Sequence, residues 1–377
     1  MEKEILGSKS TLTPKGNRIH IGIFGNTNSG KSTLLNLLTG QETSLVSSLS
    51  GTTTDPVYKP MEINGIGATT LIDTAGFDDD SELGEKRIAR TKKVLEECDI
   101  VLYVEREIEN KELLELLNIT RKPIIKINNS RKSKEGYIDF NKEEILENIK
   151  EVSTGLTVER PLLDGLLIAG ETVVLVMPQD LQAPKGRLIL PQVQTIRALL
   201  DLECSVVSCK TCDLAKTLNL LKEDPYLIIT DSQVFEEVYK LKPKKSKITS
   251  FSILMARAKG DIDELVKGAN TIDKLTKDSK VLISEACTHA PLEEDIGRIK
   301  IPNMLRAKYG DMQIDFSRGL DFPDELDYDL IIMCGSCMFN RAMVMNRIQR
   351  AKDSHIAVTN YGLTISKLKG ILDKVEY

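Results

Sequence analysis

The amino-acid sequence predicts an α/β protein in which three consecutive domains each contain a mainly parallel sheet. Short apolar runs typical of buried strands alternate with helical patterns along most of the chain, as strand–helix–strand units require. The 377 residues exceed one ordinary core, since a domain takes about 100–200 residues. Pro161 and the basic stretch 240–247 interrupt the pattern. We therefore expect domains at 1–160, 161–250 and 251–377.

Composition and charge argue against several classes of protein. The 51 basic and 56 acidic side chains leave a formal net charge of −5, which gives no footprint for binding nucleic acid. The charged N-terminus lacks an apolar signal segment, and no run approaches about 18 apolar residues. We therefore expect a cytoplasmic protein that does not enter a membrane. Seven cysteines without an export signal favour metal or thiol chemistry over disulfides.

The first domain opens with a strand, a Gly-rich loop and a helix in the order that a phosphate-binding loop (P-loop) requires. The apolar run 19–24 leads into Gly-Asn-Thr-Asn-Ser-Gly-Lys-Ser at 25–32, and a leucine-rich helical pattern follows. In such loops the backbone N–H groups bind phosphate, the lysine reaches the β- and γ-phosphates, and the serine hydroxyl binds Mg²⁺. The residues expected to bind the nucleotide phosphates are Gly25, Asn26, Asn28, Ser29, Gly30, Lys31, Ser32 and Thr33.

Two further loops carry residue types that sense a γ-phosphate. The stretch Gly-Thr-Thr-Thr-Asp at 51–55 supplies hydroxyls, and we expect Thr53 to reach Mg²⁺ and the γ-phosphate. Asp73 follows the strand 69–72 and is expected to hold Mg²⁺ through water, while the Gly76 N–H contacts the γ-phosphate. With Lys31 and Asn28, these three residues form the expected catalytic set.

The remaining elements of this domain complete a Ras-like sheet. The dipeptide Asn64-Gly65 predicts a hairpin, and hence one antiparallel edge strand on an otherwise parallel sheet. Further strands are expected at 100–104 and 123–127. The helical patterns lie at 87–97, 109–117 and 143–150.

Two residues bear on how water would attack the γ-phosphate. Phe77 stands where Ras-type enzymes carry the water-orienting Gln, so another group must do this. The domain resembles the TrmE-Era class of GTPases, in which an Asn at the position of Asn28 is associated with a potassium ion that replaces an arginine finger. The resemblance implies potassium beside the γ-phosphate; the alternative is a loop residue bonded to its own backbone. Slow turnover is expected in both cases.

Guanine selection is expected after the strand that ends near residue 127, where 126–131 reads Lys-Ile-Asn-Asn-Ser-Arg in place of Asn-Lys-x-Asp. In one register Asn128 binds the guanine edge and Arg131 replaces the Asp. In the other, Lys126 stacks on the base and Asn128 replaces the Asp. Both lose a carboxylate contact worth about 1–3 kcal/mol, so we expect weaker discrimination against adenine. Ser153, after the last helix, is expected to back the base.

The middle domain is expected to be a small dimerisation layer, with strands at 172–177, 206–207 and 227–229 and helices at 192–202 and 214–221. Cys204, Cys209 and Cys212 match the C-x₄-C-x₂-C spacing of plant-type ferredoxins. However, Cys204 and Cys209 bracket a strand and would not turn round one cluster, so structural thiols are favoured. The basic stretch 240–247 is expected to be a solvated connector.

Three cysteines of the last domain follow two apolar strands. Cys287 comes after 281–283, while Cys334 and Cys337 come after 330–333. Because ligands bind at the carboxyl ends of strands in open α/β sheets, we expect the three thiolates to converge. A tetrahedral zinc site would need a fourth protein ligand, such as His289, whereas an iron–sulfur cube held by three Cys leaves one iron open. The spacing does not choose between them. A following helix at 341–352 is expected to lower the thiol pKa values.

A P-loop domain, a middle α/β domain and a terminal Cys-x-His…Cys-x-x-Cys domain together resemble the FeFe-hydrogenase maturation GTPase family, HydF, over essentially the whole chain. The stretch 51–56 is also typical, although Met333 stands where many members carry a His. The resemblance implies a GTP-hydrolysing scaffold with a 4Fe-4S cluster on Cys287, Cys334 and Cys337 and an open fourth site. It further implies that radical-SAM maturases assemble a di-iron precursor for delivery to apo FeFe-hydrogenase. His289 would be a weak ligand or a donor behind the ligands, and Glu285, Glu293 and Glu294 are nearby carboxylates.

Two other functions remain open on the sequence. One is a TrmE-Era-type regulatory GTPase in ribosome or tRNA maturation with structural zinc, against which the acidic balance counts. The other is a redox protein whose cluster carries electrons and whose P-loop regulates it.

Overall fold

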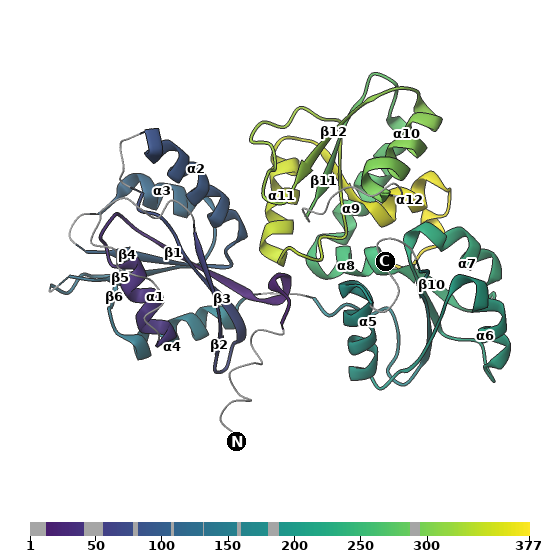
Figure 1. Ribbon diagram of the computed structural model, residues 1–377, viewed down its shortest axis with the longest axis horizontal. Coiled ribbons are helices and arrows are strands. Elements are labelled where there is room, and N and C mark those ends of the chain that lie inside the picture. The colour runs from purple at the N-terminus through teal and green to yellow at the C-terminus, as the bar shows by residue number, and fades with distance from the viewer. Residues whose placement is uncertain are drawn as a thin grey trace. The chain divides into compact units, whose positions relative to one another are not determined.

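The computed structural model describes residues 13–40, 56–77, 82–106, 109–130, 132–156, 160–179, 188–286 and 295–377. The chain divides into two compact units, 1–158 and 159–377 (Figure 1). The first unit contains one sheet and the second contains two, and all but one of the described strand pairings are parallel. The predicted α/β class with mainly parallel sheets is therefore confirmed.

The first unit is built on a six-stranded sheet in the order β2-β3-β1-β4-β5-β6. Its strands are β1 (Ile19–Phe24), β2 (Val57–Ile63), β3 (Gly67–Asp73), β4 (Ile100–Glu105), β5 (Ile124–Asn128) and β6 (Ile138–Asp139). The edge strand β2 runs antiparallel to β3, and Asn64-Gly65 lies in the turn that joins them, as the sequence predicts.

Helices cover both faces of this sheet. α1 (Lys31–Thr39) and α4 (Lys142–Thr154) pack on one face, and α2 (Glu82–Glu97) and α3 (Lys111–Ile119) on the other (Figure 1). Side chains of a strand alternate between faces, so Ile23 joins the first core and Phe24 the second. Because the strands beside β1 run parallel to it, the loops after β1 and β3 meet at one edge of the sheet.

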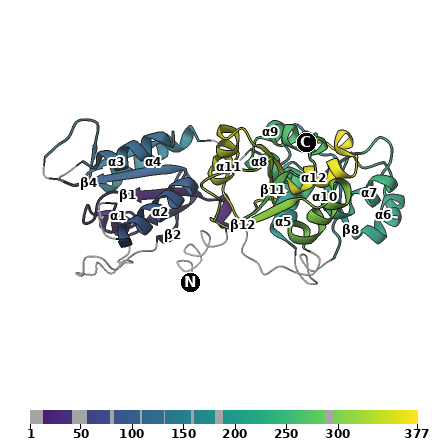
Figure 2. The ribbon, with the colours of Figure 1, turned by 90° about the horizontal axis from the view of Figure 1, so that it is seen from above.

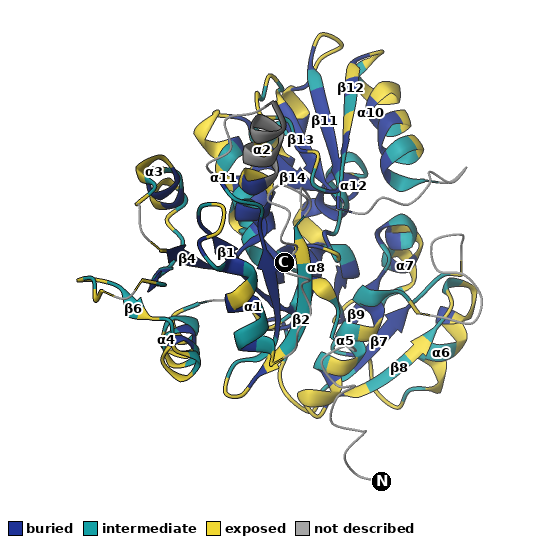
Figure 3. Cartoon of the chain, turned by 60° about the vertical axis from the view of Figure 1, so that its left-hand side comes forward, coloured by how far each residue is buried: buried dark blue, intermediate teal, exposed yellow. Residues whose placement is uncertain are grey.

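The second unit contains two four-stranded sheets, in the orders β10-β9-β7-β8 and β12-β11-β13-β14. The strands are β7 (Thr172–Val176), β8 (Ser205–Cys209), β9 (Leu227–Thr230), β10 (Lys247–Ser250), β11 (Lys280–Glu285), β12 (Gln313–Arg318), β13 (Leu330–Met333) and β14 (Ala357–Asn360). β7 and β9 are buried within their sheet, whereas the edge strand β8 carries exposed residues (Figure 3).

The helices of this unit are α5 (Leu190–Asp201), α6 (Leu214–Leu220), α7 (Phe235–Leu241), α8 (Phe251–Lys259), α9 (Ile262–Thr271), α10 (Ile301–Tyr309), α11 (Arg341–Asp353) and α12 (Tyr361–Leu368). α6 and α7 lie side by side on one face of the β7–β10 sheet (Figure 2). α5 and α8 pack against each other and contribute side chains to the core on its other face.

The basic stretch 240–247 joins α7 to β10 within the second unit, and Lys244 and Lys245 between these elements are exposed, as expected of a solvated connector. The stretch also begins a strand that was not predicted. Lys240 lies in α7, and Lys247 begins β10, which pairs in parallel with β9. Ser246 between them is 3% exposed, and its Oγ donates to Pro225 O at 2.6 Å. The sequence signal was weak because Ile248 is the one strongly apolar residue of the short strand Lys-Ile-Thr-Ser.

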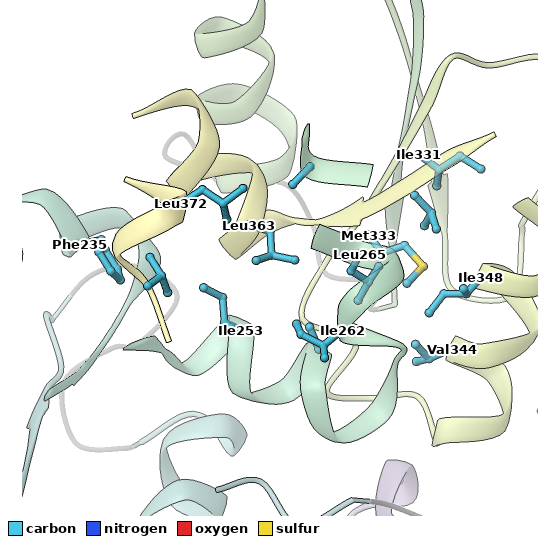
Figure 4. Close-up of a cluster of buried hydrophobic side chains, with 14 of the residues drawn as sticks. Phe235, Ile253, Ile262, Leu265, Ile331, Met333, Val344, Ile348, Leu363 and Leu372 are labelled. Atoms are coloured by element: carbon cyan, nitrogen blue, oxygen red, sulfur yellow. The ribbon is translucent and has the colours of Figure 1, made fainter. Parts of the chain in front are cut away.

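α8 contributes to the hydrophobic cores of both sheets in the second unit. Phe251 and Leu254 pack in the core of the β7–β10 sheet, while Ile253 joins a core that also includes strands of the β11–β14 sheet. In Figure 4, Ile253 lies between Phe235 of α7 and Met333 of β13. The sequence-based boundary at residue 250 falls between β10 and α8, within this shared packing.

Gly268 tests how closely α9 packs on β14. A Cβ added at Gly268 would lie 1.9 Å from the carbonyl oxygen of Val358, and this backbone atom cannot move aside as a flexible side chain would. We expect Gly268→Ala to destabilise the protein by about 1–3 kcal/mol, although Ala normally favours a helix over Gly. Urea unfolding of both forms measures this. Lys267→Ala, at an exposed position of α9, is the control, and an equal midpoint for Gly268→Ala and wild type would contradict the packing.

Candidate functional sites

The P-loop connects β1 to α1 through three residues in left-handed backbone conformations. Gly25, Asn28 and Gly30 have φ values of 155°, 59° and 104°. Asn tolerates this region better than most residues, and Gly adopts it without steric cost. A Cβ at Gly25 would lie 2.3 Å from the carbonyl oxygen of Val104, so the strand β4 leaves no room for a side chain there. The predicted glycines are therefore required by the loop geometry.

The predicted lysine and magnesium residues lie together beneath this loop. Lys31 is 7% exposed, and its Nζ donates to Gly25 O at 3.1 Å and Asn26 O at 2.7 Å. Ser32 Oγ donates to Asp73 Oδ2 at 2.6 Å, and the buried Oδ1 has no hydrogen-bond partner among the described residues. Burial raises the pKa of the Asp73 carboxyl, against the opposing effects of Ser32 and Lys31. Hydroxyl and carboxylate oxygens are ligands that Mg²⁺ prefers, so this donor set fits the ion.

The loop after β3 packs directly on the P-loop. The Phe77 N–H donates to Gly25 O at 3.3 Å, and the Phe77 side chain is 5% exposed in the core beneath α2 and α3. A Cβ at Gly76 would lie 2.1 Å from Thr27 Oγ1 and 2.6 Å from Thr27 N. Only Gly therefore fits between this loop and the P-loop, where the sequence analysis placed the γ-phosphate contact.

Asn129 is the asparagine after β5 that contacts the P-loop, whereas both registers considered in the sequence used Asn128. Asn129 Nδ2 donates to Ser29 O at 2.8 Å. The amide of Asn128 instead closes a turn, since Nδ2 donates to Lys132 O at 2.6 Å and Oδ1 accepts from Ser130 Oγ at 2.7 Å. The sequence analysis missed Asn129, although its position beside Asn128 was a usable signal. Arg131 lies outside the described residues.

The structure contradicts the expected role of Ser153 beside the base. Ser153 lies in the last turn of α4, and its Oγ donates to Ile149 O at 2.5 Å. α4 begins at Lys142 directly after β6, whereas Lys150 lies against Gly65 in the β2–β3 turn. That turn is at the edge of the sheet opposite the P-loop. The helix therefore carries Ser153 away from the nucleotide edge.

The other predicted P-loop residues have varied surroundings. Ser29 is 3% exposed, whereas Asn28 and Thr33 are exposed. Asn26 Oδ1 accepts from Asn110 Nδ2 at 2.7 Å, and Asn110 also caps the N-terminus of α3. The capping role of Asn110 has a sequence signal, but its contact with the P-loop has none. Thr53 and the rest of its loop lie outside the described residues.

Cys334 and Ala286 lie together at one edge of the third sheet. Cys334 directly follows β13, and its Sγ accepts from Ala286 N at 3.1 Å and from Ser336 N at 3.4 Å. Ala286 follows β11 and immediately precedes Cys287 in the sequence. The structure thus places Ala286 beside Cys334. Cys287 and His289 themselves lie outside the described residues.

Burial dominates the electrostatics of the two described thiols. It raises the pKa values of Cys334 and Cys337, and this outweighs the N–H donors on Cys334 and the nearby charges of Arg347 and Lys259. Backbone N–H groups lower both pKa values, as expected of such donors, but burial outweighs them in the metal-free thiols. Sulfur atoms that accept backbone N–H groups beside buried cations nevertheless fit thiolate ligands, because metal coordination deprotonates a thiol.

Glu285, a carboxylate near the cysteines, is already in contact with other side chains. Arg298 donates to its Oε2 from Nε at 3.0 Å and from Nη2 at 2.8 Å, and Tyr361 Oη donates to Oε1 at 3.4 Å. Glu293 and Glu294 lie outside the described residues.

The three middle cysteines do not form a common site in the structure. Cys204 is buried before β8, and Cys209 ends the strand, so about 16 Å of extended chain separates them. Cys212 is exposed.

Across the described ranges, no three His, Cys, Asp or Glu side chains gather closely enough to hold a metal ion. None of the described helices has the length and hydropathy needed to cross a bilayer.

Three family matches cover most of the chain. Residues 20–130 match the family described as "50S ribosome-binding GTPase". Residues 162–260 match the "Hydrogen maturase F dimerization domain", and residues 263–376 match the "Hydrogen maturase F tetramerization domain".

Curated relatives align with a smaller part of the chain. A tRNA modification GTPase MnmE of Helicobacter pylori (strain Shi470) is 36% identical over 133 residues, which cover 34% of this chain and 29% of that protein. A GTPase Der of Wolinella succinogenes is 47% identical over 89 residues, or 23% and 19% of the two chains. The chain thus spans less than a third of the length of these two relatives. A crystal structure of Aquifex aeolicus Era bound to GDP.AlF4- shares 15% identity over 79% of this chain and 93% of its own, with a TM-score of 0.27.

Gly76→Ala tests the contact between the two nucleotide loops. The new Cβ would displace Thr27 of the P-loop, because the clash involves backbone atoms as well as Oγ1. We expect GTP hydrolysis to fall about a hundredfold in a protein that stays folded, since small displacements of reacting groups cost that much. Steady-state phosphate release measures the effect. Gly155→Ala is the control, because Gly155 has a φ of −86° and an added Cβ there comes no nearer than 3.7 Å to another atom. Equal losses in both variants would contradict the assignment.

Proposed function

The chain belongs to the hydrogen maturase F (HydF) family, and we propose that it is a GTP-hydrolysing scaffold for assembly and delivery of the di-iron precursor of the FeFe-hydrogenase active site. It carries a P-loop GTPase domain and two domains with family descriptions that name oligomerisation. The observation that carries the proposal is the hydrogen bond from Ala286 N to Cys334 Sγ. It joins the segment that leads to Cys287 to the Cys-x-x-Cys loop in a chain that also has a complete P-loop.

The nucleotide part of the proposal rests on groups beneath the P-loop. A bound γ-phosphate would compete with the Gly25 and Asn26 carbonyls for the Lys31 ammonium. Mg²⁺ would bind at Ser32 and Asp73, where it supplies positive charge to the phosphates. Thr53 and the Gly76 N–H would complete the γ-phosphate contacts. Asn129 is our candidate for the base side, because its amide already contacts the P-loop.

Hydrolysis is proposed to be slow and stimulated by potassium. The Phe77 side chain is buried and apolar, so it cannot orient water as a Gln would. Asn28 is exposed on the P-loop and offers an amide oxygen to a monovalent cation. A cation at that position would offset negative charge that develops as the γ-phosphate leaves.

The metal part of the proposal is a 4Fe-4S cluster held by Cys287, Cys334 and Cys337, with His289 as a weak ligand or a donor behind the ligands. Three cysteines leave one iron with an exchangeable position, which suits a carrier. The di-iron precursor is cargo, received from radical-SAM maturases and passed to apo FeFe-hydrogenase. We propose that the protein does this in the cytoplasm as a homodimer or a larger assembly.

The alternative role in tRNA or ribosome maturation has less support. The two curated GTPase relatives described above align with 34% and 23% of this chain, whereas HydF domains match residues 162–260 and 263–376. The formal net charge of −5 also provides no general electrostatic attraction to RNA.

Two substitutions separate the nucleotide site from the metal site. After anaerobic reconstitution, we expect wild type to hold iron and sulfide at about four each per chain, the composition of a 4Fe-4S cluster. Lys31→Ala should abolish GTP hydrolysis and keep the cluster, because Lys31 Nζ donates to carbonyl oxygens of the P-loop. Cys334→Ser should lose the cluster and keep hydrolysis. Metal analysis and phosphate release measure both properties.

Three outcomes would contradict this assignment. Stoichiometric zinc in protected wild type would favour the structural-zinc alternative, and a protein without metal would remove the scaffold role. If either substitution removes both properties from a folded protein, the two sites are not separable as proposed.

Potassium dependence can be assigned to Asn28 with a conservative pair of variants. We expect faster hydrolysis in KCl than in NaCl at equal ionic strength. Asn28→Gly should abolish the difference, because it keeps the left-handed backbone but removes the amide oxygen. Asn28→Asp keeps a side-chain oxygen and should retain a preference for potassium. A KCl to NaCl rate ratio in Asn28→Gly equal to that of wild type would contradict the assignment.

A further inference from the structure

Lys259, the last residue of α8, is buried directly against the Cys-x-x-Cys loop. Its residue exposure is 1%, and its Nζ donates to the carbonyl oxygens of Phe339 at 2.7 Å, Cys337 at 3.2 Å and Ser336 at 3.5 Å. All three acceptors lie between Cys334, the first cysteine of this loop, and the start of α11 at Arg341. The sequence analysis gave no role to this lysine.

The carbonyl contacts match what an ammonium group needs. A lysine ammonium has three N–H donors and no acceptor, and three carbonyl oxygens surround it here. Burying a charge is costly unless hydrogen bonds compensate it. The rest of α8 is largely apolar, reading Phe-Ser-Ile-Leu-Met-Ala-Arg-Ala before Lys259. An apolar side chain would therefore have completed the helix at a lower desolvation cost, so the charge calls for another explanation.

The loop conformation that Lys259 contacts is strained. Ser336 has a φ of 51°, a left-handed conformation that costs a residue with a side chain about 1–2 kcal/mol. This turn directs the Ser336 N–H to Cys334 Sγ and the Ser336 carbonyl to Lys259. One strained residue thus connects the buried ammonium to the thiol of Cys334.

A second buried cation, Arg347, acts on Cys334. Arg347 of α11 is 2% exposed, and its Nη1 donates to Ser284 Oγ at 2.7 Å. Its guanidinium lies over the rings of Phe322 and Phe339, at 4.8 Å and 4.5 Å from their centroids. The charges of Lys259 and Arg347 act on Cys337 and Cys334 respectively, in the direction that favours thiolate.

We propose that Lys259 is a positioning residue for the metal cluster, which holds the Cys-x-x-Cys loop in its ligand conformation and, together with Arg347, supplies fixed positive charge behind the thiolates. This inference rests on the proposed function. Three thiolates on a 4Fe-4S core carry net negative charge, which increases by one on reduction. Fixed positive charge therefore stabilises the reduced cluster and raises its reduction potential.

The test compares four full-length proteins after anaerobic reconstitution: wild type, Lys259→Met, Lys259→Arg and Lys352→Met. Lys259→Met removes both the charge and the N–H donors, whereas Lys259→Arg keeps both kinds of group. Lys352 is a partly exposed lysine in the last turn of α11, paired with Glu264 at 3.4 Å, so Lys352→Met removes the same charge elsewhere. Iron and sulfide per chain, and the midpoint potential from an EPR-monitored titration, are the two measurements. Circular dichroism and GTP hydrolysis establish that each variant is folded.

We expect Lys259→Met to retain less than half of the iron of wild type, and its remaining cluster to have a lower midpoint potential. Lys259→Arg should restore both properties, and Lys352→Met should match wild type. Iron loss at an unchanged potential would support positioning and overturn the charge role. Normal iron content at a lower potential would support the charge role and overturn the positioning role. Wild-type iron and wild-type potential together in folded Lys259→Met would overturn the whole inference.

Misfolding of Lys259→Met and failure of the proposed function can both be told apart from failure of this inference. If Lys259→Met does not fold, Lys259→Gln replaces it, because glutamine keeps two N–H donors without a charge. An unchanged potential in Lys259→Gln would then overturn the charge role. Failure of the proposed function is distinguishable, because it appears in wild type as zinc or as no metal, whereas failure of this inference appears with an intact wild-type cluster.

Discussion

Parallel pairing between neighbouring strands is the constraint on which both sites depend. In the first unit, Ile23 pairs with Asp73, so the end of β3 arrives beside the loop that follows β1. In the second unit, Ser284 pairs with Met333, so the next residues of β11 and β13 lead to the two cysteine segments. Loops far apart in sequence therefore meet because strands of equal direction end at one edge. The chemistry of each site follows from which residues come directly after those strands.

Both edges place a buried lysine against backbone carbonyls, but with different consequences. Lys31 contacts carbonyls of the loop that would bind phosphate, so an anionic ligand competes with those contacts. Lys259 contacts carbonyls on the loop that carries Cys337, and these contacts leave the thiol available as a ligand. Lys31 therefore suits a ligand that binds and dissociates in each cycle, whereas Lys259 suits a permanently bound metal cluster. In both places carbonyl oxygens accept from the N–H donors of the buried ammonium group.

The sequence predicted those features that depend on periodicity and local motifs. Alternating apolar runs located β1, β3, β11 and β13, and the Asn-Gly turn identified the antiparallel edge strand. The sequence-based predictions failed where a shift of one residue, or burial by distant parts of the chain, decides what a side chain contacts. Asn128 and Asn129 differ by one position, yet one closes a turn and the other contacts the P-loop. Burial also reversed the direction expected for the pKa values of Cys334 and Cys337, and no local pattern reveals such desolvation.

The role of α8 explains why the second and third sheets form one compact unit. Phe251 and Leu254 pack with the β7–β10 sheet, and Ile253 faces the core shared with the β11–β14 sheet. The same helix ends at Lys259 against the Cys-x-x-Cys loop. A fragment that began at residue 251 would expose Phe251 and Leu254. Its α8, which carries Lys259, would no longer pack against the β7–β10 sheet. The change of sheet at residue 250 is thus a change in strand pairing and not in packing, and the loop conformation at the cysteines depends on both sheets.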